Sequence, residues 1–269
     1  MEIWGGSAAA ERALSTPGLE IFVWSKPHDA AAGGDVHYVS LCGGGLITRL
    51  ILADIAGHGA TVAHLARSLR DLMRRNINRK SQSRLVRELN RQFNELARVS
   101  RFATAVVATY LANRKKLTMC NAGHPRPMWY HSASDQWTFV DANEQERSGR
   151  MANLPLGIDN STSYPQVTLD LNPGDIVLLY TDALTELADS KGEMLGEQGL
   201  RRLVESICAS DAPSMARELV AALDRRRDGR AADDDATFLL LVHKTYHPKR
   251  LSIGQKLDVY AKVFGLKRV

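Results

Sequence analysis

The sequence has no apolar run long enough to cross a bilayer and no pair of neighbouring cysteines. Its apolar stretches stop short of the roughly 18 residues that a membrane-spanning helix needs, and the N-terminus lacks a basic segment followed by an apolar one. The three cysteines are far apart and form no CxxC motif, which argues against a disulfide framework and a thiolate zinc site. These absences favour a globular protein of the reducing cytoplasm, not one that enters a membrane.

Most of the chain also lacks an excess of positive or negative charge. The formal net charge of the 269 residues is +5. Residues 244–269, however, hold seven Lys or Arg against one Asp, and the remainder holds 28 basic against 29 acidic residues. A nucleic-acid enzyme needs basic side chains spread along a binding face. We therefore do not expect nucleic acid as a partner.

The length favours one large domain with short additions at each end. We divide the chain into an N-terminal extension (1–18), a main domain (19–243) and a basic C-terminal tail (244–269). Apolar residues at helical spacing predict a short amphipathic helix in the tail; they are Leu257, Tyr260, Ala261 and Phe264. This helix either packs on the domain, which we favour, or serves docking or homodimerisation. The polar residues 143–153 predict a loop.

Apolar runs rich in branched and aromatic residues predict nine strands. They are Leu19–Trp24, Val36–Leu41, Leu46–Ala53, Thr104–Leu111, Lys116–Cys120, Met128–His131, Gln166–Leu171, Ile176–Thr181 and Ala236–Val242. Cys42 and the three glycines after it predict a hairpin turn, because glycine accepts the positive φ that tight turns need.

Apolar residues that recur at helical spacing predict two pairs of helices. The first pair covers Ala60–Asn76 and Arg84–Arg98, and the second lies around Leu200–Ile207 and Ala216–Leu223. The helices follow one another in pairs and are outnumbered by strands. This order favours sheets covered by helical layers over an alternating parallel sheet.

Aspartates stand beside four of the predicted strands. Asp35 follows two glycines, Asp54 and Asp182 each end an apolar run, and residues 233–235 are all Asp. Alone, each is most simply a turn or capping residue. Carboxylates that cluster at a core edge repel one another and lose hydration, a cost that divalent cations offset. Oxygen ligands of this kind suit Mg²⁺ or Mn²⁺, not zinc.

In their order and spacing the motifs resemble the PPM-type metal-dependent protein phosphatases, in particular the bacterial branch typified by stage II sporulation protein E. The resemblance runs from about Leu19 to Val242. Its landmarks are Gly33-Gly34-Asp35, Ala53–Gly59, Phe102-Ala103-Thr104, Asn121–Pro125, Leu154–Ile158, Tyr180-Thr181-Asp182 with Thr185-Glu186, and Asp234–Thr237. It implies an α+β fold: a four-layer α-β-β-α sandwich of two antiparallel sheets flanked by helix pairs, with metals between the sheets at one end.

The resemblance also implies a site with two Mn²⁺ or Mg²⁺ ions. Asp54 would bridge both ions, and Asp35 with the carbonyl of Ile55 would complete one of them. Asp182 and Asp234 would bind the other. Metal-bound water would attack phosphorus directly, so Asp54 and Asp182 would be catalytic through it. The implied substrate is phosphoserine or phosphothreonine on a regulatory phosphoprotein of bacterial signalling, such as an anti-anti-sigma partner.

Several positions depart from the family pattern. Ala183 follows Asp182 where many relatives have glycine. Ala56 stands where many eukaryotic members carry a histidine general acid; that role is not transferred to His58, which we interpret as a turn residue that caps the following helix. An arginine that binds phosphate in some relatives has no clear counterpart. Asn121 and His124 are interpreted first as a β-turn, and second as substrate-binding residues at the entrance of the site.

Other phosphate and hydrolase chemistries lack their motifs. There is no GxxxxGK[ST] loop, no GxSxG and no HExxH. Aspartyl-phosphate enzymes need two Asp separated by one residue after an apolar strand, and Tyr180-Thr181-Asp182-Ala183-Leu184 offers one. The alternative that stays open is a catalytically inactive module of the same fold that binds a phosphoprotein regulator.

Overall fold

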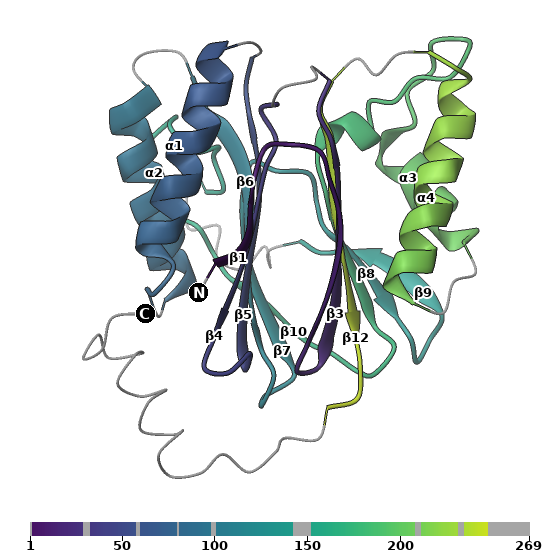
Figure 1. Ribbon diagram of the computed structural model, residues 1–269, viewed down its shortest axis with the longest axis horizontal. Coiled ribbons are helices and arrows are strands. Elements are labelled where there is room, and N and C mark those ends of the chain that lie inside the picture. Colours follow the sequence, from purple (N-terminus) through teal and green to yellow (C-terminus); the bar gives the residue numbers. More distant parts are fainter. Residues whose placement is uncertain are drawn as a thin grey trace.

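A computed structural model describes residues 2–28, 33–57, 60–79, 81–97, 101–141, 152–207, 211–230 and 234–246. Two sheets lie face to face, and a pair of helices covers the outer side of each (Figure 1). Every pairing between the named strands is antiparallel. The predicted α+β, four-layer sandwich is therefore confirmed.

The first sheet has the strand order β1-β4-β5-β6-β7-β10. Its strands are β1 (Glu2–Gly6), β4 (Val36–Cys42), β5 (Ile47–Ile55), β6 (Ala103–Leu111), β7 (Lys116–Ala122) and β10 (Val167–Asp170). The helices α1 (Ala60–Asn76) and α2 (Gln82–Ala97) cover its outer face. Leu69 of α1 and Phe93 of α2 are fully buried against Ile51 and its neighbours on the sheet.

The second sheet has the order β2-β3-β12-β11-β8-β9. Its strands are β2 (Ala10–Thr16), β3 (Leu19–Lys26), β12 (Ala236–His243), β11 (Ile176–Tyr180), β8 (Met128–His131) and β9 (Gln136–Phe139). The helices α3 (Gly196–Glu205) and α4 (Ala212–Arg227) cover it, and a 3-10 turn, η2 (Asp182–Leu184), follows β11. The side chain of Asp211 caps the start of α4 by accepting from the amide of Ser214.

Alternation along the strands separates three apolar layers. In β5, Leu50 and Leu52 face the other sheet, whereas Ile51 and Ala53 face α1 and α2. All eight residues of β12 are buried, because both faces of this central strand are covered. Each fully buried Leu or Ile contributes about 2 kcal/mol through removal from water.

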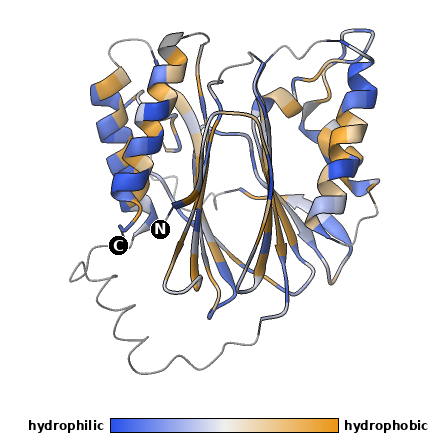
Figure 2. Ribbon diagram, viewed as in Figure 1, coloured by the Kyte–Doolittle hydropathy of each residue, from blue (hydrophilic) through white to orange (hydrophobic). Residues whose placement is uncertain are grey.

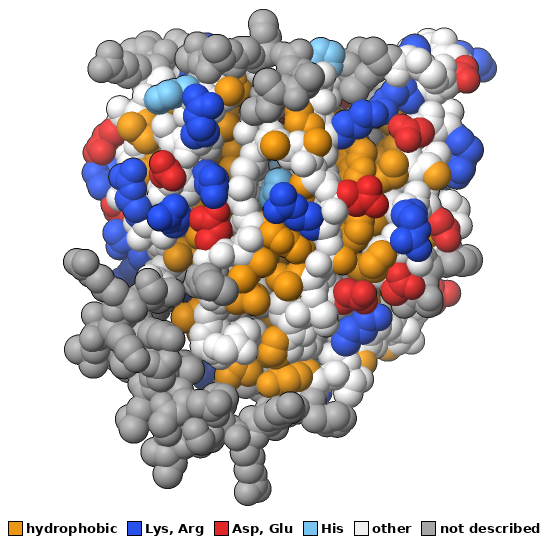
Figure 3. All heavy atoms as spheres, in the orientation of Figure 1, with side chains coloured by type: hydrophobic (Ala, Val, Ile, Leu, Met, Phe, Trp, Pro, Cys, Tyr) orange, Lys and Arg blue, Asp and Glu red, His pale blue; other side chains and the backbone are white. Residues whose placement is uncertain are grey.

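Figure 2 shows the matching pattern in the helices, where hydrophobic and hydrophilic positions alternate around each axis. In Figure 3 the charged side chains lie mostly over the helices, and hydrophobic ones gather over the strands between them.

Three strands of the structure were not predicted, namely β1, β2 and β9. β1 pairs with β4 and β2 pairs with β3, so residues before Leu19 contribute a strand to each sheet. The prediction missed β1 because it is rich in glycine, and β2 because it is an edge strand with mostly polar residues. The predicted hairpin at Cys42 is confirmed, with positive φ at the three glycines that follow it.

Two predictions fall mainly outside the described residues. These are the amphipathic helix of the tail and most of the polar loop 143–153. Within the described part of the chain, the structure has no helix that is both long and apolar enough to cross a membrane.

Candidate metal centre

The four predicted aspartates meet at one end of the sandwich because of strand direction. Asp35 precedes β4 and Asp54 lies near the end of β5, and these antiparallel strands pair Val36 with Ala53. On the second sheet, Asp182 follows β11 and Asp234 precedes β12, where Tyr180 pairs with Phe238. Residues that are far apart in sequence are thus brought to the same end of both sheets.

Asp35 is the most enclosed of these carboxylates. Its side chain is only 3% exposed. Its Oδ2 accepts a hydrogen bond from the Thr181 hydroxyl at 3.0 Å, whereas Oδ1 is buried and has no partner among the described residues. Burial, and next the negative charge of Asp54, raise the pKa of Asp35 well above its ordinary value. A buried carboxylate oxygen without a donor is costly, and a bound cation would satisfy it.

Asp54 lies within a group of like charges. Burial first, then the charges of Asp182 and Asp234, raise its pKa to about 7. The pKa of Asp182 is raised by burial and by Asp234, and that of Glu186 by burial and by Asp182. Carboxylates influence one another in this way only when they are close together and poorly solvated. Asp54, Asp182, Asp234 and Glu186 therefore lie near one another, and their role as metal ligands stays a prediction.

Backbone close to Asp54 explains the need for a glycine before Asp35. A methyl group on Gly34 would lie 2.9 Å from the carbonyl oxygen of Ile55 and 3.4 Å from Oδ1 of Asp54. The amide of Ile55 donates to the carbonyl of Gly34 at 3.3 Å. A larger residue would push the Asp35 loop away from the end of β5. The Ile55 carbonyl, predicted as a ligand, thus lies beside this loop and beside Asp54.

Asp235 fixes the same loop from the other sheet. Its carboxylate accepts from the amide of His28 at 2.6 Å and from the amide of Gly34. The amide of Asp235 in turn donates to Oδ1 of Asp234 at 2.8 Å. Asp234 is exposed. Asp235 therefore positions the backbone, and Asp234 has the freer carboxylate.

By charge and chemistry these residues fit a divalent cation. All the donors are carboxylate or carbonyl oxygens, the ligands that Mg²⁺ and Mn²⁺ prefer. Among the described residues, however, no three His, Cys, Asp or Glu side chains stand together as a ready-made ligand group. The carboxylates would therefore have to draw closer around a bound ion.

Two further charged residues lie at this end without having been predicted as site residues. Glu186 belongs to the Thr185-Glu186 landmark, yet no role was assigned to it. Arg101 immediately precedes another landmark, and a methyl group on Gly57 would lie 2.9 Å from its Nη1. Nothing in the local sequence distinguishes Arg101 from other surface arginines, because its closeness to the Asp54 turn depends on the pairing of β5 with β6.

Asn121 and His124 form the turn that the sequence favoured. The side chain of Asn121 accepts from the amide of His124 at 2.7 Å and donates to the His124 carbonyl at 2.8 Å. The buried His124 ring bonds the Thr104 hydroxyl at 2.9 Å. Both residues also line a cavity of about 290 Å³ in the side of the sandwich, next to Arg126. Their role in substrate binding stays a prediction. His58 lies outside the described residues.

The fold is that of the PP2C phosphatases. The solved PP2C phosphatase domain of SpoIIE from Bacillus subtilis matches with a TM-score of 0.68 and 17% identity, over 85% of this chain and 64% of that one. The model of the stage II sporulation protein E (SpoIIE) family matches residues 47–244. The chain belongs to this family, which confirms the resemblance seen in the motifs.

Curated relatives extend the comparison to named enzymes. The chain is 30% identical to the phosphoserine phosphatase RsbU of Bacillus subtilis (strain 168) over 160 residues, which cover 60% of this chain and 44% of RsbU. It is 22% identical to the phosphoserine phosphatase RsbP of that organism over 197 residues, covering 71% of this chain and 45% of RsbP. The chain thus spans less than half the length of these relatives.

Two further solved structures share the fold. The RsbU and RsbW domains of a Mycobacterium tuberculosis protein match with a TM-score of 0.70 and 24% identity, over 96% of this chain and 72% of that chain. RsbX, solved in complex with magnesium, matches with a TM-score of 0.63 and 15% identity, over 87% of this chain and all of RsbX.

Proposed function

We propose that the chain is a metal-dependent protein serine/threonine phosphatase that hydrolyses phosphoserine or phosphothreonine on a regulatory protein in bacterial signalling. One observation carries the proposal: acidic residues from both sheets converge on Asp54, and the buried Oδ1 of Asp35 has no partner among the described residues. Membership of the SpoIIE family supports it. The phosphoserine phosphatase activity in the names of RsbU and RsbP supports the reaction class.

We assign two Mn²⁺ or Mg²⁺ ions to the site, in line with the magnesium bound to RsbX. The proposed ligands are Asp35, Asp54, the carbonyl of Ile55, Asp182 and Asp234. When bound, such ions lower the pKa of water and offset the charge on phosphoryl oxygens. Burial first, and then the charges of Asp182 and Asp234, raise the pKa of Glu186, and bound cations would lower it again.

The chain's own residues would hold the site in shape. Thr181 donates to Asp35 and so connects the two sheets at this end. Asp235 holds the Gly34 backbone beside Ile55. Arg101, which lies beside Gly57 in the turn after Asp54, would contact a phosphate as it enters. These roles separate residues that would bind ions from residues that position them.

The proposed substrate is a phosphorylated regulator protein, of the anti-anti-sigma type that the family resemblance implied. The name of RsbU, a phosphoserine phosphatase, supports phosphoserine as the group that is hydrolysed. The unit that carries the activity would run from β1 to β12, since both sheets begin upstream of Leu19. A location in the cytoplasm, and homodimerisation through the tail, stay predictions.

The test is Mn²⁺-dependent hydrolysis of p-nitrophenyl phosphate and of a phosphoserine peptide. Wild type should hydrolyse both, and Asp54→Asn should not. Asp170→Asn is the matched control, because this exposed aspartate forms an ion pair with Lys116 on the sheet surface. If folded wild-type protein binds Mn²⁺ yet leaves both substrates intact, the inactive phosphoprotein-binding module replaces the enzyme.

A further inference from the structure

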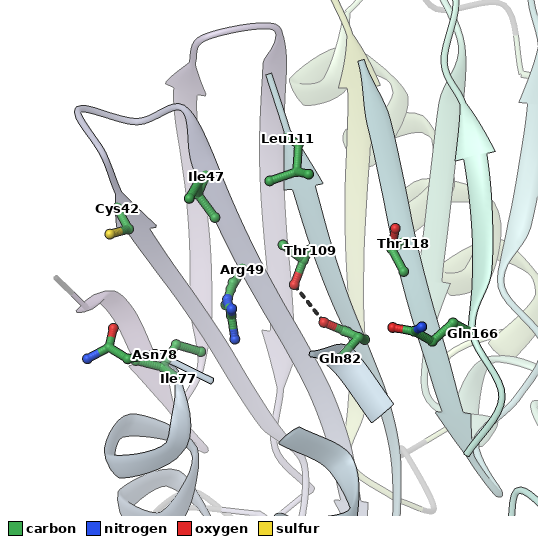
Figure 4. Close-up of a pocket in the computed structure, with 10 residues that line it drawn as sticks. All are labelled: Cys42, Ile47, Arg49, Ile77, Asn78, Gln82, Thr109, Leu111, Thr118 and Gln166. Atoms are coloured by element: carbon green, nitrogen blue, oxygen red, sulfur yellow. Dashed lines mark hydrogen bonds between the residues drawn. The ribbon is translucent and has the colours of Figure 1, made fainter. Parts of the chain in front are cut away.

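A second cavity lies at the opposite end of β5 from Asp54. It occupies about 240 Å³ on the outer face of the first sheet, under the turn that joins α1 to α2. Strands β4, β5, β6 and β7 form its floor, and Ile77 and Gln82 come from the helical turn (Figure 4). Because one water takes up about 30 Å³ of liquid, the cavity has room for on the order of eight non-hydrogen atoms.

Of the residues that the structure describes, Arg49 is the only charged one that lines this cavity. Its Nη2 donates to the carbonyl of Arg79, whereas its Nη1 is buried and lacks a hydrogen-bond partner among the described residues. Within that same part of the chain, no carboxylate forms an ion pair with Arg49. Burial lowers its pKa to about 10, so the guanidinium stays charged at neutral pH. Arg49 is half-buried, and a charged nitrogen that is buried without an acceptor is costly. An anionic ligand would remove that cost.

The wall beside Arg49 is fixed by hydrogen bonds. The amide oxygen of Gln82 accepts from the Thr109 hydroxyl at 2.7 Å, and the amide nitrogen donates to the carbonyl of Val107. Gln82 is only 5% exposed, so its side chain is held in place before any ligand binds. Figure 4 shows this bond next to Arg49. A site whose polar groups are already oriented loses little entropy on binding.

Most of the accessible surface of the lining is apolar and comes from side chains such as Ile47, Ile77 and Leu111. The uncharged polar residues Asn78, Thr118 and Gln166 complete it, and no described Asp or Glu is among the lining residues. Binding sites for small molecules commonly combine a mostly apolar lining with a few placed polar groups. The surroundings of Arg49 therefore fit a ligand with one anionic end and a short apolar body.

We propose that this cavity binds a small carboxylate with an apolar body of about five or six carbon atoms, whose carboxylate contacts Nη1 of Arg49. A guanidinium is the side chain best suited to a carboxylate. The site goes beyond the proposed phosphatase activity and does not depend on it. Arg49 and Asp54 occupy opposite parts of β5, so the two sites can be tested separately.

The first experiment measures hexanoate binding to the metal-free full chain by calorimetry, with hexanamide as the uncharged analogue. We expect saturable hexanoate binding, and roughly tenfold weaker binding of hexanamide. Arg49→Gln should remove this preference for the anion. Arg87→Gln is the matched control, because Arg87 is exposed on α2 and loses the same charge. Equal affinities for the two probes, or no saturable binding of hexanoate, would overturn the proposal.

The second experiment uses Cys42, which also lines the cavity, as a chemical probe. Alkylation of Cys42 by the anionic reagent iodoacetate and by neutral iodoacetamide is followed by peptide mass spectrometry. Hexanoate should slow both reactions, and Arg49→Gln should lower the ratio of the iodoacetate rate to the iodoacetamide rate. Ile47→Trp, which fills the cavity and keeps Arg49, should abolish protection by hexanoate. Protection that persists in Ile47→Trp would place the ligand elsewhere and defeat the assignment.

Discussion

The two ends of β11 carry aspartates in contrasting surroundings. Asp175, just before the strand, is 1% exposed and accepts from the Trp129 indole, the Ser132 amide and hydroxyl, and the Asn172 amide, at 2.8 to 3.3 Å. At Asp182, just after the strand, burial first and then the negative charge of Asp234 raise the pKa instead. A buried carboxylate with enough donors is structural. A poorly solvated carboxylate next to like charges is instead stabilised by a cation.

Asp35 shows the same contrast within one residue. Its Oδ2 has a donor in Thr181, and its Oδ1 has none among the described residues. Burial alone therefore does not identify the functional carboxylates of this fold. The number of donors around each oxygen does, and this criterion can be tested by exchanging for asparagine the aspartates at the two ends of β11 and the one near the end of β5.

The largest effect is expected for Asp54→Asn at the acidic end. Mn²⁺-dependent hydrolysis of p-nitrophenyl phosphate should fall by about a thousandfold, because metal-based charge stabilisation is worth several kcal/mol. In metal-free protein the same change should raise the melting temperature or leave it unchanged, since it removes one of several repelling charges. A variant that loses both activity and metal-free stability would place Asp54 among the structural carboxylates.

Asp175→Asn should behave in the opposite way. Asparagine replaces one acceptor oxygen with a donor that faces other donors, so the free energy of unfolding should fall by about 3 kcal/mol. Urea unfolding without metal measures this change. Activity per folded molecule at saturating Mn²⁺ should equal that of wild type. Lost activity with normal stability would mean that the comparison between the two ends of β11 is mistaken.

Asp235→Asn sharpens the distinction between a ligand and a residue that positions one. Because Asp235 holds the amides of His28 and Gly34, the change should weaken the apparent affinity for Mn²⁺ by roughly tenfold to a hundredfold, as for other residues that orient metal ligands. The maximal rate at saturating Mn²⁺ should stay within about twofold of wild type. If Asp235→Asn abolishes activity at every Mn²⁺ concentration and Asp234→Asn does not, the assignment of Asp234 as the ligand is wrong.

The sequence predicted the layers well because burial is periodic. In β5, residues alternate between two apolar layers, and in α2 the apolar set repeats at helical spacing. Strand direction then brought Asp35, Asp54 and Asp182 to one end, as the order of motifs implied. β1 and β2 escaped prediction because an edge strand with glycine or polar residues has no apolar pattern to recognise.

The sequence could not tell Asp175 from Asp182, because both flank the same apolar run. The two aspartates differ in their hydrogen-bond donors, which come from residues distant in the sequence. Ser132, for example, donates to Asp175 across 43 positions. Arg101 and the Arg49 cavity were missed for the same reason. The fold determines the surroundings of a side chain, whereas the local sequence shows only which side chain is present.

The smallest expected effect concerns the pH dependence of stability that comes from His124, a buried base. Burial lowers the pKa of His124 to about 3, although the Tyr180 carbonyl acts in the opposite direction. The unfolded chain has a histidine pKa of about 6.5. Above about pH 6.5, His124 is unprotonated in both the folded and the unfolded state. Between this pH and its folded pKa, His124 gains a proton only in the unfolded state. The His124 contribution to the free energy of unfolding should therefore fall by about 1.4 kcal/mol at pH 5.5, whereas Asp54, whose pKa is raised to about 7, acts in the opposite direction over the same range.

His124→Gln removes the titrating group and can still bond Thr104. Urea unfolding of metal-free protein at pH 7.5 and pH 5.5 should show that the part of the pH dependence due to His124, a loss of about 1.4 kcal/mol on acidification, is absent in the variant. His64→Gln, at an exposed position on α1, should leave the loss unchanged. If both variants reduce it equally, burial of His124 is not the cause. If only His124→Gln reduces it, His124 is tolerated in the interior because it is uncharged there. The carboxylates around Asp54 would instead need bound cations to balance their charge.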